Sequence, residues 1–306
     1  MLRKQLEQID SEYQQLLKEG IHNELDKKEI GKVLTGYLFH ITKNLGQKMV
    51  EVRDYNEIAE KGPFKYAGRI DTMYQEGLLP KEIYELFNEH GLNNHIGPSY
   101  LRVKGILTYQ KLREFFGNQL VYQIEKDLKN NLPDGEVLFL PNMTGGAWIG
   151  DETRRQAEEK IKEFNIWPTT PYARGARKEI EVKSKEVKLV DHIEGLVPPP
   201  EETGAVYIFE ELRTTSETTC NTARILKQHG YDKDSGVDLV AVSVYDYRHP
   251  VGVERLERAN LRQIYLVDGK NFFKASLDEG FISDPEYQTG IEWLSDPWKF
   301  TEKVLS

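Results

Sequence analysis

The sequence predicts an α/β protein in which a helical N-terminal region precedes a parallel sheet flanked by helices. Residues 1–130 carry apolar side chains mainly at helical spacing. Across 131–306, short apolar runs alternate with amphipathic helices, and such continuous runs are typical of strands that are buried on both faces. A chain of 306 residues, 39% of them hydrophobic, is long enough for one large domain or two modest ones.

The N-terminal region begins with two expected helices. Apolar residues between Leu6 and Leu17 recur at helical spacing, and Gly20 ends the pattern. A second helix is expected to begin near Asp26, because Glu29 stands three positions later, where a capping box requires it. Apolar side chains then continue at helical spacing for several turns, which predicts a long amphipathic helix.

The rest of this region is less regular. Residues 51–78 show no sustained period and are expected to be irregular. Pro80 is expected to open a short helix that ends at Gly91. Thr108 has a side chain suited to an N-cap, and apolar residues at helical spacing across 112–124 predict the helix that it would begin.

The second region alternates between strands and helices, which indicates βα units. The expected strands are EVLFL (136–140), AVYIF (205–209), DLVAVSVY (238–245) and QIYLV (263–267). Helices are expected at about 151–164 and 217–229. The segment 178–204 breaks this rhythm, because it alternates residue types like an antiparallel ribbon and then becomes a proline-rich loop.

The composition excludes several classes of function. A net charge of −9 and a pI near 5.5 give the protein no electrostatic attraction to nucleic acid or anionic membranes. No apolar run approaches about 18 residues and the N-terminus is charged throughout, so neither a membrane span nor a signal peptide is expected. A single cysteine, Cys220, excludes an intramolecular disulfide and fits the cytoplasm. Seven scattered histidines predict no zinc site.

Two adjacent carboxylates, Glu210 and Glu211, follow the expected strand 205–209 and precede the hydroxyl-rich loop 214–218. Ligands of a parallel sheet bind beyond the carboxyl ends of its strands. The loop leads into a helix, whose free backbone N–H groups and dipole favour a phosphate. The stretch therefore predicts a phosphate site beside two acids that can bind sugar hydroxyls or magnesium. The alternative is a pair of solvated acids followed by an ordinary helix N-cap.

Four apolar residues, two acids and then x-x-T-T-x-x-T resemble the phosphoribosyl-pyrophosphate (PRPP) motif of the type I phosphoribosyltransferases, in register from Val206 to Thr218. That motif usually has aspartate where this chain has Glu211 and glycine where it has Ser216. Glu217 adds a negative charge to the same loop. The resemblance implies that the acids hold the ribose hydroxyls and magnesium waters, and that the loop holds the 5-phosphate.

Other stretches extend the resemblance toward the orotate phosphoribosyltransferase branch. LPNMTGGAWIGDETRRQA (140–157) looks like the family's first strand and pyrophosphate loop. PYARGARKE (171–179) is similar to that branch's basic strand, which leads into a mobile hood. The run 242–267 resembles its Asp-Arg strand and the helix and strand after it, and GPFKYAGRIDTMY (62–74) is similar to its N-terminal segment.

The resemblance implies a role for each matching residue. The implied 5-phosphate site comprises Thr214, Thr215, Ser216, Glu217 and Thr218, and the implied pyrophosphate site comprises Thr144, Gly145, Gly146, Arg177 and Lys178. The implied catalytic residues are Glu210, Glu211 and Lys183, with both acids also carrying Mg²⁺ and with Arg248 at the base. The alternative for the basic residues is a solvated charged face. Outside the motifs, Trp148 is expected in the core and His249 at the surface or in the hood.

The expected activity is transfer of the 5-phosphoribosyl group of PRPP to a nitrogen of a base, with an orotate-type or related pyrimidine favoured and pyrophosphate released. The resemblance implies Mg²⁺ as cofactor, a homodimer, and a hood at about 179–200 that closes to exclude water. Two alternatives stay open. One is a regulator on the same fold that senses PRPP or a nucleotide without catalysis, and the other is an interaction protein that works through its helical N-terminal region.

Overall fold

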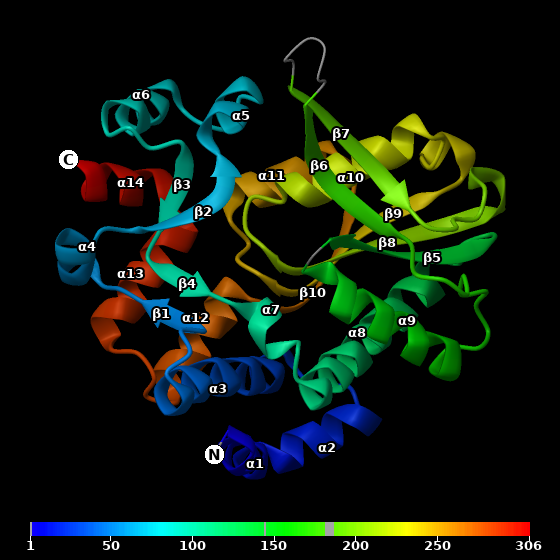
Figure 1. Ribbon diagram of the computed structural model, residues 1–306, viewed down its shortest axis with the longest axis horizontal. Coiled ribbons are helices and arrows are strands. Elements are labelled where there is room, and N and C mark those ends of the chain that lie inside the picture. The colour runs from blue at the N-terminus through cyan, green and yellow to red at the C-terminus, as the bar shows by residue number, and fades with distance from the viewer. Residues whose placement is uncertain (1, 144, 181–186) are drawn as a thin grey trace.

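The computed structural model describes residues 2–143, 145–180 and 187–306, with the backbone alone at 2, 3, 5, 45, 67, 174–180 and 187–192. A six-stranded sheet lies at the centre of this described part, in the order β10–β9–β8–β5–β6–β7 (Figure 1). The strands are β5 (Glu136–Met143), β6 (Tyr172–Ile180), β7 (Val187–Glu194), β8 (Thr203–Arg213), β9 (Asp238–Asp246) and β10 (Arg262–Asp268). All are parallel except β7, which is antiparallel to β6. The predicted α/β class is confirmed.

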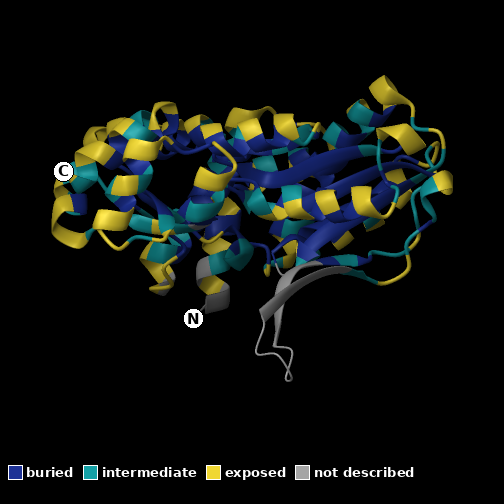
Figure 2. Cartoon of the chain, turned by 90° about the horizontal axis from the view of Figure 1, so that it is seen from above, coloured by how far each residue is buried: buried dark blue, intermediate teal, exposed yellow. Residues whose placement is uncertain are grey.

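Helices cover both faces of the sheet, because neighbouring residues of a strand point to opposite faces. In β8, Val206 and Ile208 pack on the face of α10 (Glu217–Gln228) and α11 (Pro250–Arg258), whereas Tyr207 and Phe209 belong to the larger core on the other face. The helices over that face are α3 (Lys27–Leu45), α8 (Gln110–Asn131), α9 (Gly146–Lys160) and α12 (Gly269–Asp278). Figure 2 shows the buried strands between helices whose outer surfaces are exposed.

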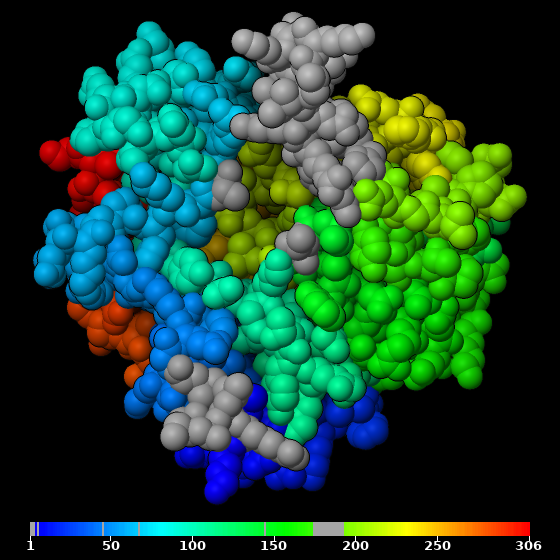
Figure 3. Space-filling model, in the orientation of Figure 1, coloured from blue at the N-terminus to red at the C-terminus, as the bar shows by residue number. Residues whose placement is uncertain are grey.

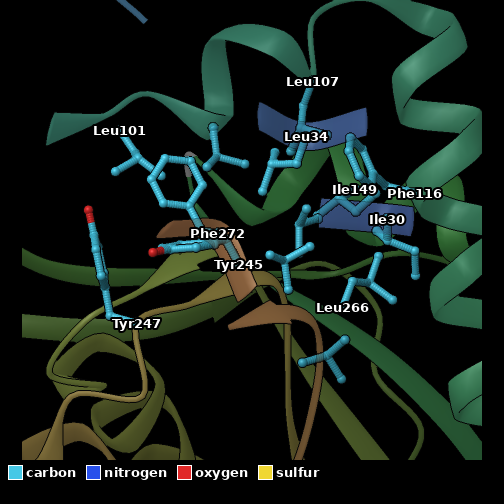
Figure 4. Close-up of a cluster of buried hydrophobic side chains, with 14 of the residues drawn as sticks. Ile30, Leu34, Leu101, Leu107, Phe116, Ile149, Tyr245, Tyr247, Leu266 and Phe272 are labelled. Carbon is cyan, nitrogen blue, oxygen red and sulfur yellow. The ribbon is translucent and has the colours of Figure 1, made fainter. Parts of the chain in front are cut away.

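The N-terminal region shares the larger core with the sheet. Figure 4 shows Ile30 and Leu34 of α3 and Phe116 of α8 in one cluster with Leu266 of β10 and Phe272 of α12. These side chains are at most 1% exposed. The division into 1–130 and 131–306 stays a prediction, and the apolar side chains of the two parts are buried in common.

The N-terminal helices agree in part with those that the sequence predicts. They are α1 (Leu2–Glu12), α2 (Gln14–His22), α6 (Lys81–Glu89), α7 (Val103–Ile106) and the longer α3 and α8. The first expected helix is divided at Tyr13. Asp26 caps α3 and Glu29 completes the capping box, as predicted. The expected cap at Thr108 is wrong, because its hydroxyl donates to the carbonyl oxygen of Gly105 over 2.7 Å while α8 begins at Gln110.

The expectation that residues 51–78 are irregular is also wrong. This part contains β1 (Val50–Val52), α4 (Tyr55–Lys61), β2 (Phe64–Arg69) and α5 (Ile70–Gln75). The strands find antiparallel partners far along the chain, β1 with β4 (Ser99–Leu101) and β2 with β3 (Asn94–Gly97). A short strand stabilised by a distant partner leaves no local period in the sequence.

The ribbon predicted from 178–204 is confirmed in its backbone. β6 and β7 pair antiparallel from Tyr172 opposite Glu194 to Ile180 opposite Val187. Figure 1 shows the two strands extending beyond the rest of the sheet. A short 3-10 turn at Pro200–Glu202 then leads into β8.

The C-terminal helices α13 (Asp284–Ser295) and α14 (Pro297–Leu305) complete the fold. His249 is fully buried beside His95 and Trp293, with ring centroids 4.3 and 5.6 Å apart, so the expected surface position is wrong. Trp148 is 48% exposed beneath the guanidinium of Arg113, so its expected core position is wrong too. Within the described ranges, every helix is too short or too polar to span a membrane.

Candidate active site

The predicted site lies where the strand order of the sheet reverses. From β5 the chain crosses to β6 on one side, and it returns to β8 on the other side of β5. Such a reversal opens a crevice at the carboxyl ends of the two strands. A cleft of about 570 Å³ lies there, and its lining includes Asn142, Gly145, Glu210, Glu211 and residues 214–218. Figure 3 shows this face hollowed between the cyan N-terminal segment and the green and olive part of the chain.

Glu210 is buried at the end of β8, with 8% of its surface exposed. Its Oε1 accepts a hydrogen bond of 3.1 Å from Nδ2 of Asn142 on β5. Burial, followed by the negative charge of Glu211, raises the pKa of Glu210 to about 7. The Thr219 hydroxyl, the charge of Arg213 and the Asn142 amide act in the opposite direction. This carboxyl group therefore changes its charge near neutral pH, and a cation in the cleft would favour the charged form.

The carboxylate of Glu211 lies against the backbone of the loop between β5 and α9. A β-carbon added to Gly145 would stand 1.5 Å from Oε2 of Glu211, so the present arrangement requires glycine. A β-carbon on Gly146 would stand 2.1 Å from the carbonyl oxygen of Phe209. Burial raises the pKa of Glu211, and the positive charge of Lys104 acts against this rise. Both glycines thus allow the loop to approach β8 closely.

The loop 214–218 turns through a residue in the left-handed conformation. Ser216 has a φ of 55° and is the N-cap of α10, where its side chain makes no capping hydrogen bond. This conformation favours glycine, which is the residue that the PRPP motif has here. Thr215 and Ser216 are buried, whereas Thr218 is exposed in the first turn of α10. The first turn of a helix leaves backbone N–H groups without helix partners, and these are donors that an anion can bind.

A buried arginine that the sequence did not single out lies behind this loop. Arg255 of α11 is 5% exposed, and its Nη1 donates to the carbonyl oxygen of Thr215 over 2.9 Å while its Nε bonds Glu76 over 2.6 Å. The same guanidinium stands 4.0 Å from the carboxylate of Glu217, which also accepts from the backbone N–H of Arg69 over 3.4 Å. Arg255 therefore offsets the negative charge that Glu217 brings to the loop. A lone basic residue on an amphipathic helix gives no such signal in the sequence.

The N-terminal segment around β2 forms the opposite wall of the cleft. Tyr66 and Gly68 line it together with Ser99 and Tyr247. The hydroxyl of Tyr66 donates to the carbonyl oxygen of Ser99 over 2.6 Å, and Oγ of Ser99 lies 3.0 Å from the hydroxyl of Tyr247. A β-carbon on Gly68 would stand 2.7 Å from the side chain of Thr215, so this wall directly touches the loop. The cleft thus has one acidic side and one aromatic, hydroxyl-bearing side.

Four of the predicted site residues have no described side chain. Thr144 and Lys183 lie outside the described residues. Arg177 and Lys178 lie on β6, where the backbone alone is described, opposite Val190 and Leu189 of β7. The roles of these four residues at the pyrophosphate and in catalysis stay predictions.

Arg248 lies apart from the cleft. Its backbone N–H donates to Asp246 over 2.7 Å, and its φ of 56° is left-handed. The guanidinium bonds Gln263 of β10 and lies 5.2 Å from the ring centroid of Tyr265. Arg248 is absent from the described lining of the cleft. Its contact with a base stays a prediction, and this orientation lends it no support.

The two acids of the cleft can supply part of the ligand set of a magnesium ion. The described residues contain no cluster of three or more His, Cys, Asp or Glu side chains that could hold a metal by themselves. Glu210 and Glu211 supply carboxylate oxygens, and Mg²⁺ favours such hard oxygen ligands while keeping several waters. The pair therefore suits an ion that takes its other ligands from water and from the phosphates of a substrate.

Comparison with known proteins gives only distant similarities. No family model matches the chain, and no curated protein does. Among solved structures, the UMP synthase of Leishmania donovani superposes with a TM-score of 0.48 at 14% identity, over 90% of this chain and 43% of that one. Orotate phosphoribosyltransferase of Francisella tularensis gives 0.44 at 8% identity, over 66% and 87%.

The orotate phosphoribosyltransferase of Mycobacterium tuberculosis gives a TM-score of 0.40 at 14% identity, over 81% of this chain and 98% of that one. This chain spans less than half the length of the UMP synthase chain.

Proposed function

We propose that this chain binds PRPP with magnesium in the cleft and transfers the 5-phosphoribosyl group to a ring nitrogen of a base, with release of pyrophosphate. One observation carries the proposal: the Glu210–Glu211 pair meets the left-handed loop 214–218 in one cleft, at the reversal of the sheet. The motif match from Val206 to Thr218 supplies the identity of the ligand.

Each part of the cleft then has a task. The backbone N–H groups of the loop bind the 5-phosphate, helped by the hydroxyls of Thr214 and Thr218. Glu210 and Glu211 accept hydrogen bonds from the ribose hydroxyls and hold the magnesium waters. Gly145 and Gly146 let backbone approach the pyrophosphate. Magnesium, when bound, neutralises the leaving group.

In the reaction, the bond between the ribose anomeric carbon and pyrophosphate breaks, a bond from the base nitrogen to that carbon forms, and the proton of that nitrogen leaves with the pyrophosphate. Positive charge develops on the ribose during the exchange, and the two nearby carboxylates stabilise it. Water is the competing nucleophile. A ribbon hood at about 179–200 that closes over the ligands, with Arg177, Lys178 and Lys183 at the pyrophosphate, would exclude it.

The acceptor is proposed as a nitrogenous base. Preference for an orotate-type or related pyrimidine follows from the resemblance of 171–179 and 242–267 to the orotate branch. A homodimer and a location in the cytoplasm stay predictions from the same resemblance and from the single cysteine.

The test is an assay of pyrophosphate release from PRPP with magnesium and a panel of purines and pyrimidines, orotate included. Release that depends on one base, and that is lost in Glu210→Gln, supports the proposal. Absence of PRPP binding by calorimetry overturns it.

A second candidate is a sensor that binds PRPP or a nucleotide without turnover. Two departures from the PRPP motif favour it: Glu211, where the motif usually has aspartate, and Ser216, where it has glycine. PRPP binding with no pyrophosphate release for any base would establish this candidate in place of the enzyme.

A further inference from the structure

Three buried polar side chains from three elements form a hydrogen-bonded chain that ends on Glu210. The hydroxyl of Thr222 in α10 donates to Oδ1 of Asn142 in β5 over 2.6 Å. Nδ2 of Asn142 in turn donates to Oε1 of Glu210 in β8 over 3.1 Å. Thr222 and Asn142 are each 2% exposed, and Glu210 is 8% exposed.

This chain fixes the orientation of the Asn142 amide. When Glu210 is ionised, its carboxylate accepts hydrogen bonds and donates none, so the amide then turns its NH₂ group toward Glu210. The carbonyl end then faces Thr222, whose hydroxyl can donate to it. The reversed amide would set its carbonyl oxygen against the carboxylate and lose that hydrogen bond.

Burying the polar side chains of Asn142 and Thr222 costs free energy of folding, and their hydrogen bonds to each other and to Glu210 offset it. On β5, Leu138 and Leu140 alternate with the same period as Asn142 and are fully buried apolar residues, whereas position 142 is polar. A buried amide and a buried hydroxyl oppose folding unless both are hydrogen-bonded. Their hydrogen bonds connect Thr222 through Asn142 to Glu210, which lines the cleft. The polar pair can therefore orient a side chain of the site.

We propose that Asn142 and Thr222 are positioning residues, which hold the Glu210 carboxylate in one rotation so that it is aligned with the ligand in the cleft. This inference rests on the proposed function and assigns a role to two residues outside the acid pair and the loop. An unrestrained carboxylate rotates about its Cγ–Cδ bond and spends part of its time misaligned with a ribose hydroxyl. The loss falls on the transition state, where alignment matters most, and less on binding, which has other contacts.

The test compares three variants of the whole protein. Thr222→Val keeps the shape of the side chain and removes the donor, whereas Thr222→Ser keeps the donor. Thr153→Val is the matched control, because Thr153 is fully buried but its hydroxyl donates to the carbonyl oxygen of Ile149 in its own helix over 2.6 Å. kcat and KM for PRPP are measured with magnesium and the accepted base, and Tm is measured for each variant.

In Thr222→Val, kcat is expected to fall about threefold to tenfold with KM for PRPP nearly unchanged, which is the size of effect that one hydrogen bond between neutral groups gives. Thr222→Ser is expected to restore kcat, and Thr153→Val to retain it. Equal kcat in Thr222→Val and Thr153→Val overturns the positioning role, as does a fall that Thr222→Ser fails to restore.

Failure of the proposed function has a different signature. A wild-type protein that releases no pyrophosphate with any base overturns the enzyme before the variants are compared, and the positioning role falls with it. Turnover in the wild type with no difference among the variants overturns the positioning role alone.

Discussion

The carboxylate of Glu211 lies directly over the α-carbon of Gly145, where the loop after β5 meets the end of β8. A β-carbon at position 145 would stand 1.5 Å from Oε2 and 1.9 Å from Cδ of Glu211. The Glu211 carboxylate can therefore occupy this position because residue 145, in the loop after β5, has no side chain. A methyl group at position 145 is expected to displace the Glu211 carboxylate and to leave the strands in place.

Gly145→Ala is expected to displace the Glu211 carboxylate and to weaken PRPP binding in the presence of magnesium about tenfold. Gly31→Ala is the control, because its β-carbon meets nothing closer than 3.8 Å inside α3. The control should keep the affinity and raise the free energy of unfolding by about 0.5–1 kcal/mol. Calorimetry and denaturation check both; unchanged affinity in Gly145→Ala would remove Glu211 from the ligand site.

Activity is expected to rise with pH through about 7. Burial and Glu211 raise the pKa of Glu210 to about 7, so the group is mostly neutral below that pH and mostly charged above it. The charged form is the one that holds magnesium waters and a developing positive charge. In Glu210→Gln, turnover should fall on the order of 100-fold and the rise should vanish. Profiles of kcat/KM against pH test this, and an identical rise in the variant assigns the titration to another group.

Ser216→Gly is expected to be tolerated and to stabilise the fold by up to about 1 kcal/mol, because it relieves a left-handed serine at φ 55°. Ser216→Val should destabilise it and block backbone approach to a phosphate. Asn260→Gly relieves another left-handed residue at φ 55°, outside the described lining of the cleft. Both glycine variants should gain stability in denaturation, and only Ser216→Val should lower the affinity for ribose 5-phosphate. Equal affinity in all three would separate the loop from the phosphate.

The fold is expected to lose stability in acid through His95 and His249. Burial lowers the pKa of His95 to about 3, and burial with the charges of His95 and Arg255 lowers the pKa of His249 well below its ordinary value. An unfolded histidine takes up a proton near pH 6.5, so stability is complete above that pH and falls as the pH drops toward about 3. The loss should be on the order of 1 kcal/mol per histidine for each pH unit below about 6.

Urea denaturation at neutral and mildly acid pH measures this loss. His95→Phe keeps an aromatic ring in the cluster and should remove its share of the pH dependence. His22→Gln, at an exposed position, should leave the dependence as it is. A wild-type protein whose stability is flat over this range would show that neither histidine is buried in solution.

The sequence predicts the parallel sheet well because its strands are buried on both faces. The four apolar runs that predict β5, β8, β9 and β10 need no knowledge of their partners. The capping box at Asp26 is equally local. β2 is missed because its stability comes from β3, which pairs Phe64 with Gly97. Exposure at Trp148 and burial at His249 depend on tertiary packing that composition does not encode.

In the candidate site too, residues of a local motif could be predicted from the sequence and residues that act through distant contacts could not. Glu210, Glu211 and Ser216 belong to one continuous motif, so their meeting in a cleft could be expected from spacing. Arg255 and Asn142 act through contacts with other elements, and each looks like an ordinary residue of its helix or strand. Arg248 occupies a motif position too, and its side chain bonds Gln263 outside the described lining of the cleft, so its contact with a base stays a prediction.

Gly68 and Thr215 are in contact, although nearly half of the sequence lies between them and is synthesised in the interval. The N-terminal wall leaves the ribosome early, yet it has nothing to close against until the loop after β8 has been synthesised. During translation the growing protein therefore passes through a long stage in which the segment around β2 exists and the cleft is incomplete. Closure over so long a separation is slow, since loop entropy is lost before the contact forms. The cleft thus cannot close until the loop after β8 has been made.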